Sequence, residues 1–104
     1  MSHSEDFQEI TGDELYSNGV RTGILIALYT LKKITFTNLL KSTGIPKSSL
    51  HVHLKWLSDN GYIIIKKELT IKRPMTFVRI TPSGMEKIEK YLNILENIKK
   101  INKN

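Results

Sequence analysis

The amino-acid sequence predicts a single domain of the α+β class that is mainly α-helical. Three observations lead to this prediction. A chain of 104 residues has room for one modest hydrophobic core. Apolar residues recur at helical spacing on both sides of a central stretch, and that stretch, 62–80, is instead rich in β-branched residues. The expected order is therefore helices, a β-hairpin and a long final helix.

The charges are unevenly distributed along the chain. The net charge is +6, yet residues 1–14 contain five acidic side chains and no basic one. Between residues 32 and 79, ten lysines and arginines are accompanied only by Asp59 and Glu68. Such a clustered excess is typical of a protein that binds a polyanion. A basic surface that serves only solubility is the alternative.

The composition and motifs disfavour several classes of protein. Without cysteine there is no disulfide, thiolate nucleophile or sulfur ligand for a metal. No apolar run approaches the ~20 residues that span a bilayer, and the acidic start is unlike a signal peptide. No glycine-rich phosphate loop, carboxylate-pair motif or nucleophile with a base is present. We therefore expect a cytoplasmic protein that is not an enzyme, uses no cofactor and has no membrane partner.

Residues 1–17 form an acidic segment that is either an arm or a short helix. The pattern from Thr11 to Glu14 fits a capping box, so a helix is predicted to begin near residue 12. From Val20 to Lys32 apolar residues recur every three or four positions. This stretch is predicted to be the first long helix.

Two short helices follow, joined by a tight turn. After a link at 34–36, which is possibly a small strand, a helix capped by Thr35 runs to about Ser42, and Gly44 ends it. The second helix covers 46–59, with proline at its first position. Its apolar face consists of Leu50, Leu54 and Leu57. This is the pattern of a helix-turn-helix, in which one helix braces a second that presents its outer face.

The hairpin and the last helix complete the chain. Strands are predicted over 62–71 and 75–80, joined by a basic turn, and Thr81 then caps a helix over 81–104. This helix carries two apolar stripes, and a small domain can cover one of them, so the second is predicted to meet another copy of the chain. A single wide apolar face is the alternative. The predicted dimer interface is Tyr91, Ile94, Leu95, Ile98 and Ile101.

A family resemblance rests on Thr35-Phe36-Thr37-Asn38-Leu39-Leu40, Thr43-Gly44-Ile45, Pro46-Lys47-Ser48-Ser49-Leu50, His53-Leu54, Leu57, Asp59-Asn60-Gly61-Tyr62-Ile63 and Ile80-Thr81-Pro82-Ser83-Gly84. In this order the residues resemble the winged helix-turn-helix regulators of the MarR and ArsR kind, above all the short archaeal ones. The resemblance implies a DNA-binding domain over 18–80 and dimerisation through 81–104. It also implies transcriptional regulation, most commonly repression. Cysteines of ArsR-type metal sensors are absent, and little chain is left for a MarR-type effector pocket, so the effector stays unknown.

The second helix of the motif is expected to enter the major groove of DNA. At about 100° per residue, its outer face is opposite Leu50. That face consists of Lys47, Ser48, His51, Val52 and Lys55. Ser48 and His51 are the predicted base contacts, and Ser49 is able to hold a phosphate. His53 lies on the apolar side and is assigned a structural role. Because it points about 200° away from His51, the two cannot chelate one metal ion, and no metal site is predicted.

Further contacts to DNA are expected from the wing, 66–79, and from the bracing helix. In proteins of this kind the tip, here Lys72 and Arg73, commonly meets the minor groove or its phosphates. The predicted phosphate contacts of the strands are Lys66, Lys67 and Arg79, and those at the start of the bracing helix are Thr35, Thr37 and Asn38.

Two other functions are compatible with this sequence. An architectural nucleoid protein would coat DNA through its phosphates with little base discrimination. A winged helix used for protein contact would instead present an apolar patch that includes Val52 and Trp56. Trp56 lies to the side of the buried face and is expected to be partly buried.

Overall fold

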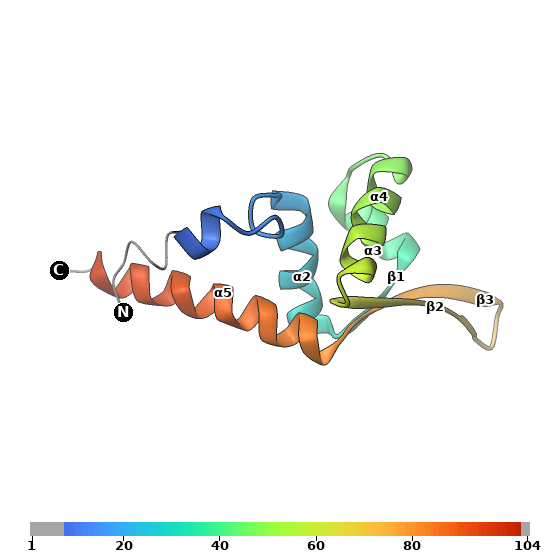
Figure 1. Cartoon of the computed structure of the whole chain (residues 1–104). Coiled ribbons are helices and arrows are strands. Elements are labelled where there is room, and N and C mark those ends of the chain that lie inside the picture. The colour runs from blue at the N-terminus through green and yellow to red at the C-terminus, as the bar shows by residue number, and fades with distance from the viewer. Residues whose placement is uncertain (1–7, 103–104) are drawn as a thin grey trace.

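The computed structural model describes residues 8–102 as helices packed on a small antiparallel sheet, which confirms the predicted mainly helical α+β class (Figure 1). A short helix over 8–11 precedes the named elements. These are α2 (Gly19–Leu31), β1 (Lys33–Thr35), α3 (Phe36–Thr43), α4 (Lys47–Asp59), β2 (Ile63–Leu69), β3 (Pro74–Ile80) and α5 (Pro82–Ile101). The molecule measures 53 × 23 × 23 Å, because α5 and the β2–β3 hairpin project in opposite directions.

The local signals for helix ends act largely as predicted. The Thr35 hydroxyl accepts from the backbone N–H of Asn38 at the start of α3, and Gly44 ends that helix with a φ of 66°. The Thr81 hydroxyl accepts from Gly84 N–H at the start of α5. Helix α4 begins at Lys47, one residue later than predicted, so Pro46 is its N-cap residue and not its first helical residue. No side chain caps the start of this helix. The two helices of the motif are therefore separated by a rigid, short turn.

The sheet has the order β1-β3-β2. Of the predicted link at 34–36, Ile34 and Thr35 belong to strand β1. β1 pairs with β3 only from Lys33 opposite Arg79 to Thr35 opposite Phe77. The β2–β3 pairing continues to Leu69 opposite Pro74. Beyond Phe77 the sheet is thus only two strands wide, and this part projects from the body as the wing.

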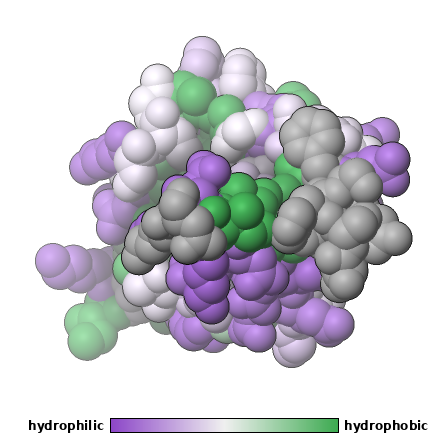
Figure 2. Space-filling model, turned by 90° about the vertical axis from the view of Figure 1, so that its left-hand side faces the viewer, coloured by the Kyte–Doolittle hydropathy of each residue, from purple (hydrophilic) through white to green (hydrophobic). Residues whose placement is uncertain are grey.

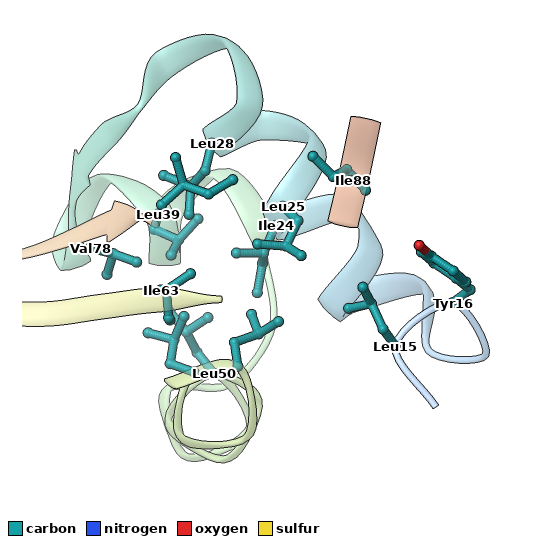
Figure 3. Close-up of a cluster of buried hydrophobic side chains, with 13 residues drawn as sticks. Leu15, Tyr16, Ile24, Leu25, Leu28, Leu39, Leu50, Ile63, Val78 and Ile88 are labelled. Atoms are coloured by element: carbon teal, nitrogen blue, oxygen red, sulfur yellow. The ribbon is translucent and has the colours of Figure 1, made fainter. Parts of the chain in front are cut away.

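The hydrophobic core lies where α2, α3, α4, the sheet and the first turns of α5 meet (Figure 3). Leu50, Leu54 and Leu57 of α4 are almost completely buried, as the helical spacing predicts. The other members are Leu15, Tyr16, Ile24, Leu25, Leu28, Leu39, Ile63, Val78, Ile80 and Ile88. One continuous core therefore fixes the angle at which the motif is held against the wing.

Residues 8–17 pack along α5, and two ion pairs join them to it. The Glu9 carboxylate pairs with Lys90 and the Asp13 carboxylate with Lys87. Tyr16 stacks on Tyr91 with ring centroids 4.7 Å apart, and its burial raises the pKa of the phenol to about 12. These acidic groups are thus paired with α5, away from α4.

The prediction of a helix that starts near residue 12 is wrong. The helix covers 8–11, and the Thr11 hydroxyl donates to the carbonyl of Gln8, 3.5 Å away, within that helix. The Asp13 carboxylate accepts from Leu15 N–H at 2.8 Å and closes a turn instead. Asp side chains compete in this way with helical hydrogen bonds, which is why the capping pattern was misleading.

Lys32 ends α2 in a backbone conformation that favours glycine, with a φ of 68°. We expect Lys32→Gly to raise the free energy of unfolding by about 0.5–1 kcal/mol, because glycine relieves the steric strain. Chemical denaturation measures this change. In the control, Lys41→Gly in α3, where φ is helical, should lower the free energy of unfolding by a similar amount. A loss of stability in both variants would contradict the strain at Lys32.

Candidate nucleic-acid interface

The outer face of α4 is open to solvent along its whole length. Lys47, Ser48, His51, Val52 and Lys55 are all exposed, and Ser49 is half-buried at the edge of this face. The leucines on the other side hold the helix to the core. An exposed helix with short polar side chains near its N-terminus has the dimensions and chemistry that the major groove accepts.

His51 is exposed, but a neighbour holds its ring. It stacks on Phe36 at the start of α3, with centroids 4.8 Å apart and an angle of 25° between the rings. Stacking uses the flat face of an imidazole and leaves hydrogen bonding to the ring edge. Phe36 therefore restricts the ring that is predicted to contact a base. No local pattern in the sequence indicates this role, because the contact joins two helices.

Lys55 has an acidic partner on its own helix. Its ammonium lies 2.8 Å from an Asp59 carboxylate oxygen, four residues on, and both side chains are well exposed. Exposed pairs of this kind contribute only about 0–1 kcal/mol. A phosphate can therefore replace Asp59 as the partner of Lys55 at little cost.

Arg21 of α2 braces the inner side of α4. Its Nε–H donates to His53 Nδ1 at 3.3 Å, and its guanidinium lies 4.3 Å from the centre of the Trp56 ring. His53 and Trp56 are both half-buried, so the structural role predicted for His53 and the partial burial predicted for Trp56 are confirmed. This bracing connects the recognition helix to α2 across the core. No sequence motif indicates Arg21.

The start of α3 and the base of the wing line a common hollow of about 330 Å³. It lies along β3 beyond the end of β1, where β3 has no strand partner on that side. The hollow is lined by Thr35, Phe36, Thr37, Arg73, Pro74, Met75 and Thr76. Thr35 and Thr37, two predicted phosphate contacts at the start of α3, thus lie beside Arg73 of the wing, which is more than 35 residues further along the chain. An N-terminal helix end next to a guanidinium favours an anion.

The lysines of the wing are divided between its two faces. Lys66 is paired opposite Phe77 and Lys67 opposite Thr76, so the two side chains point to opposite sides of the hairpin. Both are exposed, as are Lys72 and Arg73 at the tip. A wing that lies flat on DNA therefore turns only one of Lys66 and Lys67 toward it.

Arg79 is less available than the sequence suggests. Glu68 lies between two cations, with its carboxylate oxygens 2.8 Å from Lys33 Nζ and 3.6 Å from an Arg79 nitrogen. The hydrogen bond from Lys33 holds the pKa of the Glu68 carboxyl below its usual value. Glu68 therefore neutralises part of the basic charge of the sheet, and only the β1–β3 pairing brings Lys33 to it.

The predicted dimer interface on α5 is partly covered by the chain itself. Ile94 is buried and Tyr91 is half-buried against Tyr16. Leu95, Ile98 and Ile101 are 40%, 37% and 44% exposed. Figure 2 shows a hydrophobic patch at this end of the molecule, with hydrophilic side chains below it in this view. The apolar surface that α5 leaves open is therefore its C-terminal half.

Two kinds of site are not found in the part of the chain that the structure describes. Between residues 8 and 102, no three His, Cys, Asp or Glu side chains are grouped so that they could hold a metal ion. Over the same residues no helix has the length and apolar character that crossing a membrane requires.

Known proteins match both the sequence and the fold. Residues 20–99 match the family model described as a winged helix DNA-binding domain. An uncharacterised protein of Methanocaldococcus jannaschii is 30% identical over 79 residues, or 76% of this chain and 86% of that protein. A transcriptional regulator homologue from Pyrococcus horikoshii OT3 is 30% identical and superposes with a TM-score of 0.85, over 96% of this chain and 99% of that one. MepR, a transcription regulator of a Staphylococcus aureus multidrug efflux pump, shares the fold at 15% identity, with a TM-score of 0.71 over 95% and 71% of the two chains.

Proposed function

Because the chain belongs to the winged helix DNA-binding domain family, we propose that it is a sequence-specific regulator of transcription that binds double-stranded DNA as a homodimer. Helix α4 enters the major groove, and the wing meets the minor groove or its phosphates. Repression, by occupation of an operator that polymerase must cross, is the proposed mode. The observation that carries this proposal is the exposed outer face of α4 beside a basic wing.

The chemistry of that face favours sequence recognition over simple coating. Ser48, His51 and Val52 offer hydrogen bonds to base edges and an apolar contact for a thymine methyl. A protein that only coats DNA requires cations alone. The protein-contact alternative needs Trp56 in an exposed patch, whereas Trp56 lies under Arg21.

Selection from a randomised duplex pool at about 150 mM salt tests the proposed function. We expect an enriched inverted repeat with half-sites about 10 base pairs or a multiple of that apart, because a two-fold dimer spaces its recognition helices by whole turns. Affinity that follows salt alone, with no enriched sequence, would contradict sequence-specific regulation and favour the architectural alternative.

Substitutions separate base contacts from phosphate contacts. Ser48→Ala and His51→Ala should each relax the preference at a defined base pair, at a cost of about 1–3 kcal/mol for the preferred site. Arg73→Ala should instead weaken binding to all duplexes and reduce the slope of log affinity against log salt by about 1. Lys99→Ala, which removes the same charge near the far end of α5, is the control and should leave both unchanged. An unaltered preference in His51→Ala would move the reading face elsewhere.

A further inference from the structure

The tip of the wing carries apolar side chains where turns ordinarily carry polar ones. Ile71, in the turn between β2 and β3, is 106% exposed relative to a fully open residue, and Leu69 is 85% exposed. Pro74, which is also exposed, pairs with Leu69 across the hairpin. Gly, Asn, Asp, Ser and Pro dominate such turns, and a β-branched residue gains nothing there from burial. The stability of the fold therefore does not explain why an isoleucine stands at this position.

The turn holds this side chain in a defined place. The Thr70 hydroxyl accepts from the backbone N–H of Lys72 at 3.3 Å and of Arg73 at 3.2 Å, and it donates to the Arg73 carbonyl at 2.7 Å. The Thr70 N–H also donates to that carbonyl, at 3.2 Å. A tip ordered in advance loses little conformational entropy when it binds.

The charges around the tip identify the partner. Lys72 and Arg73 adjoin Ile71, and residues 69–74 include no acidic side chain. Lysine is depleted from surfaces that dock proteins. Proteins that enter the minor groove combine cations with apolar wedges of the Leu, Ile or Pro type, which separate neighbouring base pairs. The tip is also continuous with the hollow lined by Arg73 and the start of α3, an arrangement that favours an anion.

We propose that Ile71 is a wedge that enters the minor groove and partly unstacks one base step, so that the bound duplex is kinked at the wing. Leu69 covers the side of the opened step. Pyrimidine–purine steps unstack most easily, and TA or CA is therefore the step expected beneath the wing. This inference rests on the proposed binding of duplex DNA and adds a second means of recognition that involves no hydrogen bond to a base.

Fluorescence of 2-aminopurine tests the wedge directly. The probe is a duplex of about 30 base pairs with TA steps along it, in which the adenine of each step in turn is replaced by 2-aminopurine. Binding of the wild-type chain should raise the fluorescence at the step beneath the wing, because unstacking relieves quenching. Ile71→Ser should abolish the rise and weaken binding about tenfold, while the salt slope is kept because no charge is lost. Leu31→Ser, at an exposed leucine that ends α2, is the control and should change neither.

The outcomes distinguish this inference from the function on which it rests. Duplex binding by the wild type with no fluorescence rise at any step overturns the wedge and leaves DNA binding intact. Absence of binding to any duplex, even at low salt, overturns both. If Ile71→Ser abolished binding to vesicles of anionic phospholipid and left duplex binding unaltered, the tip would be a membrane-binding site. That result also overturns the wedge. The fluorescence rise with the wild-type chain tests the wedge without any variant. Ile71→Ala is a second variant for the comparison with the wild type, and it changes the tip less than Ile71→Ser does.

Discussion

Replacing Leu95 and Ile98 together with lysine should convert the proposed dimer to a monomer and weaken binding to an inverted-repeat duplex by about 10²–10⁴-fold. Leu95 and Ile98 are 40% and 37% exposed and lie outside the buried core cluster, so the monomer is expected to fold without them. Lysines in an apolar interface leave charges without water or partners. In a dimer, binding of one subunit to its half-site holds the other subunit at a high effective concentration near the second half-site. A monomer lacks this gain in affinity.

Analytical ultracentrifugation gives the oligomeric state, and a binding titration gives the affinity. The matched control is Asn93→Lys with Asn97→Lys, which adds the same charge at exposed polar positions of the same helix. The control should remain a dimer. A dimer that survives the Leu95 and Ile98 substitutions would place the interface elsewhere in the chain. Ile94, which the sequence analysis placed in the interface, is a poor choice for this test because it is buried within the chain itself.

Gly84→Ala should lower the free energy of unfolding by about 3 kcal/mol. A Cβ at this position would lie 2.2 Å from the Tyr62 carbonyl oxygen and 2.8 Å from Ile80 Cγ1. That oxygen accepts from Thr81 N–H at 3.0 Å, so it cannot move away without loss of the bond that joins β2 to the start of α5. Overpacking at a backbone contact is among the costliest single changes.

Urea denaturation of the variant measures this loss. The control is Gly23→Ala in α2, where an added Cβ meets no atom within 4 Å. Alanine there should raise the free energy of unfolding by up to about 1 kcal/mol, since glycine is a poor helix former. If Gly84→Ala were as stable as the wild type, the close approach of α5 to Tyr62 would be contradicted.

Most of the fold could be predicted from the sequence because its signals are local. Helical periodicity identifies the buried leucines of α4, and caps such as Thr35, Gly44 and Thr81 mark helix ends. Each of these signals depends on residues within about four positions of one another. The same reasoning found the exposed face of α4, because a helix with one buried face must expose the other.

The remaining features depend on which elements meet, and at what angle or register. The contact of Arg21 with His53, the ion pair of Lys33 with Glu68 and the packing of Tyr16 on Tyr91 each join parts of the chain more than thirty residues apart. Local spacing carries no information about them. Where the local pattern failed, at Thr11, a nearby side chain offered the backbone a competing hydrogen bond.

The sequence by itself determined the order of the elements from α2 onward, the core face of α4 and the basic character of the wing. Only the tertiary structure decided that Glu68 partly neutralises Arg79, that Ile94 is buried while Leu95, Ile98 and Ile101 stay partly open, and that Ile71 is fully exposed. The physical reason is that exposure is a property of assembled surfaces. A side chain is buried or left open by neighbours that the chain brings to it only after it has folded.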